Sequence, residues 1–169
     1  EDNIETSLLI CNIIDPTNNK YYGNKPLVKK NIDDYDIYFL PSSVSMFINI
    51  NIVENFDIYF DEDLGIGAKW GAGEDVELSF RIYTKYNTCF YNGYMNVFHP
   101  VVEGGETPRK AYEYGAGTGA LAANLIIQSH YKHIKVFLRY VIRSLLGATF
   151  YLLLFRKNNF LSYFNRMVG

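Results

Sequence analysis

All 18 acidic residues of this 169-residue chain lie at or before Glu113. Only nine basic residues accompany them, so residues 1–113 carry a formal charge of −9, whereas residues 114–169 carry +7. This division predicts an acidic body followed by a basic tail that meets something anionic. Because the basic residues are not spread over the chain, the pattern argues against a uniformly basic nucleic-acid binder, and we expect no nucleic-acid partner.

The basic tail is also apolar. Residues 136–155 are mainly apolar and would form a helix about 30 Å long, enough to cross a bilayer. Four cations with spacings of three, four and four residues lie on one helical stripe: Lys132, Lys135, Arg139 and Arg143. The stripe favours a helix in the anionic headgroup layer over a spanning one, and a core or oligomer helix is the remaining alternative. His130 and His133 are expected at the surface.

Patterning along the chain predicts an α/β fold. Cys11 and Cys89 lack the spacing of a metal site or disulfide framework and are expected to be buried thiols. Expected strands cover SLLICNII (7–14), DIYFLP (36–41), SVSMFINI (43–50) and two short segments around a turn at Asn92-Gly93. Residues 51–60 are expected to form a short helix or a turn. Expected helices cover 74–87, 109–130 and 132–155, the second with a glycine-rich interruption at 114–120.

A glycine-rich loop precedes the clearest expected helix. It occupies residues 60–73 and carries four glycines in nine residues, which leave it little intrinsic rigidity. The helix then opens with Glu74, Asp75 and Glu77, as suits the dipole of a helix N-terminus. On this pattern alone, the three acids are ordinary first-turn residues.

Four segments stand in a characteristic order: FDEDLG at 60–65, GEDVEL at 73–78, FHP at 98–100 and YGAG at 114–117. Their order and spacing resemble the C-terminal half of the catalytic domain of family 2 glycosyltransferases. These are inverting enzymes of the GT-A fold that build bacterial polysaccharides such as capsules. The resemblance covers residues 36–130. It implies a partial GT-A domain over residues 1–131, followed by a membrane-associating helical tail over 132–169.

The resemblance implies transfer of a sugar from a nucleotide-sugar donor to a saccharide or lipid-linked acceptor at the cytoplasmic face of the cell membrane. Asp75 takes the role of the catalytic base, with Glu74 supporting it. An inverting transfer needs one carboxylate that accepts the proton of the attacking hydroxyl. His99 corresponds to a ligand of a divalent cation, Mn²⁺ or Mg²⁺. The alternative for His99 is a strand-end histidine bonded to backbone.

The loop before Asp75 is the candidate acceptor site. Trp70 can stack on a sugar ring, or instead anchor the loop in the core. Asp61, Glu62 and Gly73 complete the candidate acceptor contacts, although the FDEDLG turn can equally be acidic because it is solvated.

The family binds its donor with an N-terminal half ending in Asp-x-Asp. Neither Asp34-Tyr35-Asp36 nor Asp61-Glu62-Asp63 has the required context, since the first precedes its apolar run and the second belongs to FDEDLG. We therefore expect the chain alone to lack donor binding and turnover. The alternative function is a non-catalytic module with a membrane-binding tail.

The run GAGTG at 115–119 also matches the glycine-rich loop of S-adenosylmethionine-dependent methyltransferases. That loop requires a preceding apolar strand and an acidic residue about 20 positions later. The preceding segment is ETPRKAYEY, and no acid follows Glu113. The glycines are therefore interpreted as allowing close helix approach.

Overall fold

The computed structural model describes residues 5–23, 25–53, 58–100, 107–127 and 133–169. The chain has mixed α/β structure and forms two compact units: unit 1 is Glu1–Phe60 with Asp75–Glu103, and unit 2 is Asp61–Glu74 with Gly104–Gly169. The predicted α/β class is confirmed at this level. The units alternate along the sequence, so the glycine-rich loop belongs to unit 2 although residues of unit 1 precede and follow it.

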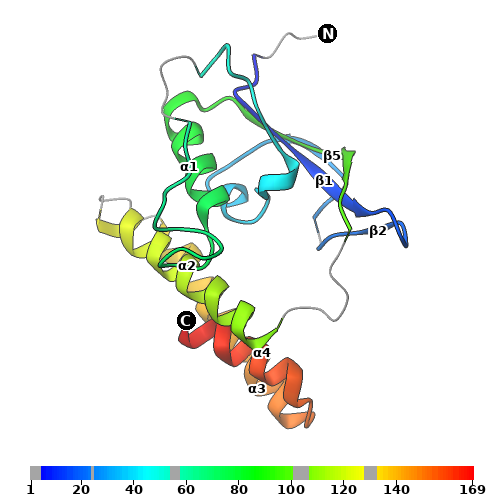
Figure 1. Ribbon diagram of the computed structural model, residues 1–169, viewed down its shortest axis with the longest axis vertical. Helices are drawn as coiled ribbons and strands as arrows, with labels where there is room; N and C mark the ends of the chain where they lie inside the picture. The colour runs from blue at the N-terminus through cyan, green and yellow to red at the C-terminus, as the bar shows by residue number, and fades with distance from the viewer. Residues whose placement is uncertain (1–4, 24, 54–57, 101–106, 128–132) are drawn as a thin grey trace. The chain divides into compact units, whose positions relative to one another are not determined.

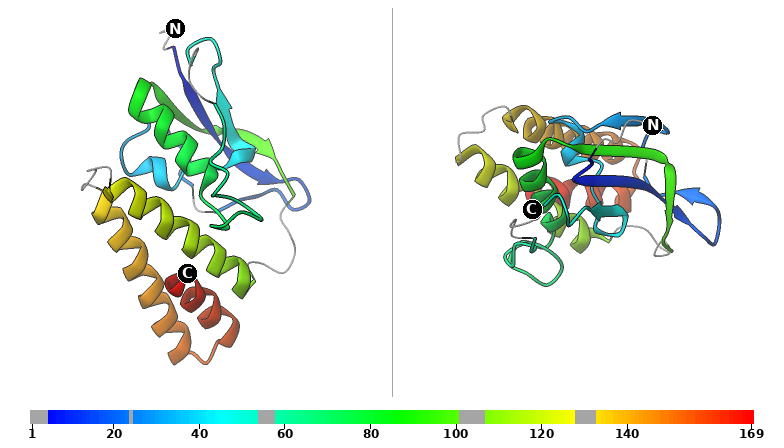
Figure 2. Two further views of the ribbon diagram at one scale, coloured as in Figure 1. Left: turned by 60° about the vertical axis from the view of Figure 1, so that its left-hand side comes forward. Right: turned by 90° about the horizontal axis from the view of Figure 1, so that it is seen from above.

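Unit 1 is built on a five-stranded mixed sheet in the order β2-β1-β5-β3, with β4 on β1 as well. Figures 1 and 2 show the twist of this sheet. Only β1 and β5 run parallel, and the other pairs are antiparallel. The strands are β1 (Leu8–Asp15), β2 (Lys20–Tyr21), β3 (Lys29–Asn31), β4 (Met46–Ile48) and β5 (Cys89–Phe98).

The expected hairpin at Asn92-Gly93 is wrong. β5 is one strand that pairs with β1 on both sides of a bulge: Asn92 lies opposite Cys11, and Asn96 lies opposite Asn12. Three residues of β5 are therefore interposed between neighbouring positions of β1. The Gly93 amide donates to the Val28 carbonyl, and these tertiary bonds replace the turn that the dipeptide favours locally.

Two further strand predictions need correction. Residues 36–38 form a 3₁₀ turn, η1 (Asp36–Tyr38), because the Asp33 carboxylate accepts the amides of Tyr35 and Asp36 and so caps a turn. The expected buried strand at 43–50 divides into a 3₁₀ turn, η2 (Ser43–Ser45), and β4. β4 is a half-exposed edge strand. Residues 51–53 form a turn, as one alternative predicted, and 54–57 lie outside the described residues.

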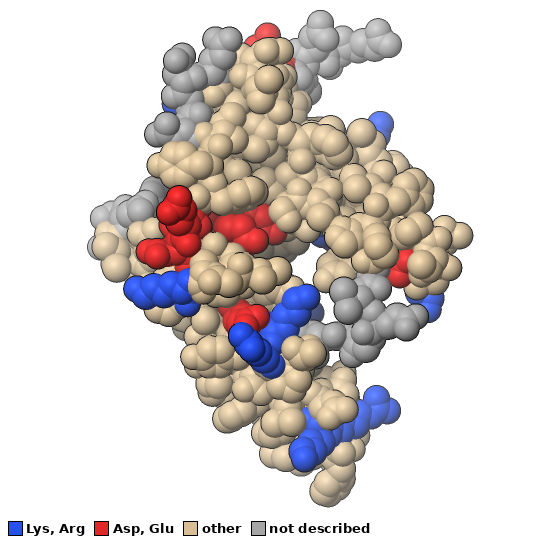
Figure 3. Space-filling model, in the orientation of Figure 1, with Lys and Arg blue, Asp and Glu red and all other residues tan. Residues whose placement is uncertain are grey.

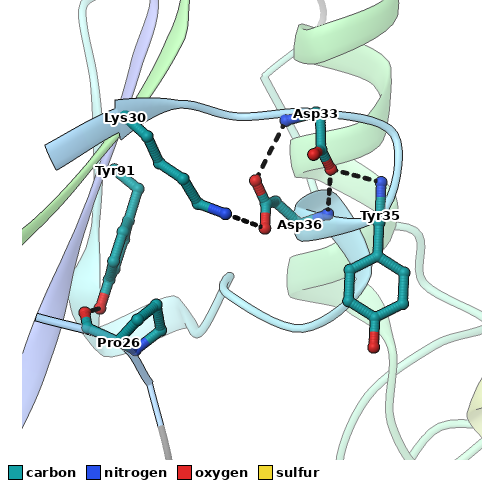
Figure 4. A network of polar contacts seen from close by, with 6 residues as sticks. All are labelled: Pro26, Lys30, Asp33, Tyr35, Asp36 and Tyr91. Carbon is teal, nitrogen blue, oxygen red and sulfur yellow. Dashed lines mark hydrogen bonds and ion pairs between the residues drawn. The ribbon is translucent and has the colours of Figure 1, made fainter. Parts of the chain in front are cut away.

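Buried polar groups tie the loops of unit 1 to the sheet (Figure 4). The hydroxyl of the fully buried Tyr91 lies 2.8 Å from the Pro26 carbonyl and 3.0 Å from Asn12 Oδ1. On β3, Lys30 Nζ lies 2.6 Å from Asp36 Oδ1 in an ion pair. Asp36, part of the literal Asp-x-Asp at 34–36, is thus used to fix η1 against β3.

The described residues of unit 2 form three α-helices: α2 (Pro108–Ile127), α3 (Ile134–Leu153) and α4 (Lys157–Val168). α3 and α4 form the helical hairpin visible in Figure 2, and α4 also packs against α2. The predicted helix at 132–155 is confirmed as α3 within shorter bounds, whereas α4 was not predicted. Within the described ranges, α3 alone is long and apolar enough to cross a membrane by length and composition.

The predicted interruption of the helix at 114–120 is wrong, because α2 runs through all three glycines. A Cβ at Gly115 would meet the Arg166 carbonyl of α4. Close packing therefore offsets the low helix propensity of glycine, as the interpretation of GAGTG anticipated. His133 is also placed differently from expectation: it is buried at the start of α3. His130 lies outside the described residues.

We expect Tyr91→Phe to destabilise the chain by about 1–2 kcal/mol, because it removes a buried hydroxyl and leaves its acceptors without that donor. Urea unfolding followed by circular dichroism measures the change. Tyr94→Phe on the same strand is the control, since Tyr94 is 61% exposed and should change stability by less than about 0.5 kcal/mol. Equal losses for both variants would contradict the role of the buried network.

Candidate functional site

Asp75 begins the part of α1 that belongs to unit 1. α1 (Glu74–Tyr86) confirms the predicted helix, and its buried apolar residues are Leu78, Phe80 and Ile82. One carboxylate oxygen of Asp75 accepts the Val76 amide at 2.8 Å, and the other accepts the Ser43 amide at 3.3 Å. The carboxylate is thus held at a helix N-terminus, where amides and the helix dipole stabilise negative charge.

A lysine that the sequence did not single out lies near Asp75. Burial lowers the pKa of Lys25 to about 8, against the opposing attraction of Asp75. Lys25 Nζ also donates to the Leu40 carbonyl at 2.6 Å. Lys25, through the Leu40 carbonyl, and Asp75, through the Ser43 amide, therefore both bind the segment 40–43. No local pattern identifies a lysine 50 residues before the carboxylate that it faces.

The loop of unit 2 before Asp75 is closed by its own backbone. The Trp70 amide donates to the Asp63 carbonyl at 2.8 Å, and the Gly65 amide donates to the Trp70 carbonyl at 3.0 Å. Gly65, Gly67 and Gly73 all adopt positive φ, which accounts for glycine at these positions. The loop predicted to be intrinsically flexible therefore has a defined closed path.

The end of this loop packs directly on α2. A Cβ at Gly117 would meet the Ala72 carbonyl, and a Cβ at Gly71 would lie 2.6 Å from the Glu113 side chain. The carboxyl group of Glu74 lies against Gly65, so this predicted supporting residue contacts the loop. The glycine-rich part of α2 thus sets the position of residues 71–73.

The candidate acceptor residues have different surroundings within unit 2. Trp70 is 37% exposed, and the Lys69 ammonium lies 5.0 Å from the centroid of its ring. Asp61 is half-buried and accepts the Asp63 amide at 2.9 Å, which stabilises the turn. Glu62 is exposed. Gly73 is needed for its φ of +104° directly before α1.

His99 lies just beyond the end of β5 in unit 1 and is exposed. Its Nδ1 lies 2.8 Å from the Pro100 carbonyl. A carbonyl only accepts, so Nδ1 donates, and in the neutral ring Nε2 then carries the lone pair that a metal ligand needs. The described residues contain no group of three or more His, Cys, Asp or Glu side chains arranged to hold a metal. His99 is thus a single candidate ligand without a described ligand set.

We expect Gly117→Ala to displace residues 70–73 and to destabilise the chain by about 1–3 kcal/mol, because the new methyl group overlaps the Ala72 carbonyl. Thermal unfolding and the emission maximum of Trp70 report the two effects. Gly119→Ala on the same helix is the matched control: a Cβ there meets nothing within 4 Å, so helix propensity predicts unchanged or slightly higher stability. Equal effects at both positions would rule out the proposed packing.

We compared the chain with protein-family models, with curated proteins and with solved structures, and none of the three comparisons found a match. The mixed α/β architecture and the local geometry of the candidate residues therefore rest on the structure itself. The resemblance to family 2 glycosyltransferases consists of four short sequence segments, named above.

Proposed function

We propose that the chain is the acceptor-side portion of an inverting glycosyltransferase with a GT-A fold. The observation that carries the proposal is the carboxylate of Asp75, held by two backbone amides at the start of α1 and accompanied by Lys25. Interaction between the two charges is reciprocal, so the ammonium stabilises the carboxylate anion. A general base must be in this ionised form before it accepts a proton.

In the proposed reaction, Asp75 accepts the proton of an acceptor hydroxyl as that oxygen bonds to the anomeric carbon of the donor sugar. The bond from that carbon to the nucleotide breaks on the opposite face, and the nucleotide leaves with the electron pair. The family resemblance assigns the acceptor sugar to Trp70, Asp61 and Glu62, because an indole ring can stack on a sugar and carboxylates accept hydrogen bonds from its hydroxyls. The acceptor is a saccharide or a lipid-linked saccharide.

A divalent cation would balance the charge of the leaving diphosphate. Among the described residues only His99 is a candidate ligand, and a single imidazole is not a cation site. We therefore derive no step that passes through the metal. Membrane association through residues 132–169, at the cytoplasmic face of the cell membrane, completes the proposal.

We expect Asp75→Asn to lower kcat by about 10²–10⁴-fold, because the amide keeps the size of the side chain but accepts no proton. Sugar transfer is measured with the native protein that contains this chain and a panel of nucleotide-sugar donors. Donor affinity should stay unchanged. Glu77→Gln is the matched control, since Glu77 lies in the same helical turn and its amide still accepts from Arg81. Similar activity of both variants would make Asp75 an ordinary first-turn acid and favour the non-catalytic module.

The pH profile tests the role of Lys25. Its lowered pKa means that Lys25 loses its proton as the pH rises through about 8, and the cation beside Asp75 disappears. We therefore expect kcat to fall above this pH. Lys25→Arg should move the fall to higher pH, because a guanidinium keeps its charge. Coincident profiles of wild type and variant would show that this charge does not support the base.

A further inference from the structure

An exposed apolar segment of unit 2 lies where α3 ends and the chain turns into α4. Four consecutive apolar side chains form it, and Phe155 is 95% exposed while Leu153 is 71% exposed. Arg156 and Lys157 follow directly and are exposed as well. We call these six residues the hairpin tip: Leu152, Leu153, Leu154, Phe155, Arg156 and Lys157.

Neither packing nor backbone preference explains the residue at position 155. α3 ends in a Schellman motif, in which the Phe155 amide donates to the Leu152 carbonyl and the Arg156 amide to the Tyr151 carbonyl. The motif places Phe155 in the left-handed region, with φ of +53°, where glycine is the usual residue. A large ring at this position is strained and does not contribute to the core of the described structure.

Every charged side chain of α3 and α4 is positive. The whole segment after Glu113 contains no acid, and α3 and α4 carry Lys135, Arg139, Arg143, Lys157 and Arg166. In Figure 3 the end of the molecule where α3 and α4 meet shows blue and tan atoms but no red ones. Apolar side chains next to cations suit an anionic lipid surface, because the apolar groups leave water and the cations meet the headgroups.

The exposed face of α3 continues the tip. Ser144 and Ala148 mark its buried side, and the opposite side exposes Leu138, Ile142, Leu145 and Leu146. Lys135, Arg139 and Arg143 of the predicted stripe are exposed on or beside this apolar side at four-residue intervals, while Lys132 lies outside the described residues. An apolar side with a cationic flank is typical of a helix that lies in the membrane interface.

The hairpin also favours insertion of its tip over passage of α3 across the bilayer. α4 has 12 residues and would be about 18 Å long, too short to return through a hydrocarbon core of about 30 Å. α4 packs along both α2 and α3, so a spanning α3 would require this packing to be broken. Insertion of the tip leaves the three helices as they are.

We propose that the hairpin tip inserts into an anionic lipid surface, with Leu153 and Phe155 entering the acyl boundary and Arg156 and Lys157 contacting the headgroups. The inference deepens the membrane association of the proposed function. It does not depend on Asp75 or on sugar transfer. It assigns the contact to six residues at one end of the hairpin instead of the tail as a whole.

The experiment measures binding of the full chain to vesicles that contain phosphatidylglycerol and to vesicles of phosphatidylcholine alone. We expect Leu153→Ser with Phe155→Ser to weaken binding to anionic vesicles at least about tenfold. Ile66→Ser with Ile127→Ser is the matched control, because these side chains are 84% and 80% exposed elsewhere in unit 2. Arg156→Gln with Lys157→Gln should weaken binding to anionic vesicles only, and added salt should weaken binding of the wild type.

Phe155→Gly separates binding from folding. Glycine relieves the strained backbone, so the variant should unfold at the same or a higher temperature than wild type and still bind vesicles less tightly.

Phe155→Trp reports how deeply position 155 enters the bilayer. Brominated lipid should quench the emission of the new tryptophan, while the emission of Trp70 in the wild-type chain should not be quenched. Equal binding by the tip and control variants would overturn the proposal. A second result would also overturn it: the wild type sediments as a dimer, and the tip variants sediment as monomers while their vesicle binding is unchanged. The tip would then bind a second copy of the chain. Loss of sugar transfer in Asp75→Asn with intact vesicle binding would separate the two proposals.

Discussion

Parallel pairing of β1 with β5 determines how unit 1 is connected. Two parallel strands cannot be joined by a tight turn, because the chain must first return to the end of the sheet where it began. Here the return contains about 70 residues, including three short strands, both 3₁₀ turns and α1. Asp75 lies within this return path, and its carboxylate accepts the amide of Ser43 in η2, a turn that contacts both strands of the parallel pair.

The same return path contains the part of unit 2 that precedes α1. The chain leaves unit 1 after Phe60 and re-enters it at Asp75. Between these points the loop follows α2 closely, because Gly71 and Gly117 lack the side chains that would separate the two backbones. A candidate acceptor loop and a candidate base are therefore adjacent in sequence while their supporting contacts belong to different units.

Features that depend on neighbouring residues could be predicted from the sequence, whereas features that depend on contacts between distant residues could not. α1 was predicted because its apolar spacing and acidic first turn are local signals. The Asn92-Gly93 turn and the interruption of α2 were predicted from local propensities as well, and both were wrong because tertiary contacts of Gly93 and Gly115 outweigh those propensities. α4 had a readable signal in the spacing of Phe160, Leu161 and Phe164. Lys25 and Ser43 had none, since their relation to Asp75 exists only in the folded chain.

The discontinuity of unit 2 has a consequence for the order of folding during synthesis. Unit 1 is complete once residue 103 has left the ribosome, but the loop at 61–73 must wait for α2 before its glycines have a partner. α2 in turn receives its close neighbour at Gly115 only when Arg166 is made, and Gly169 lies against the Tyr112 carbonyl. Residues 166–169 therefore complete the support of a loop whose residues are made about 100 positions earlier.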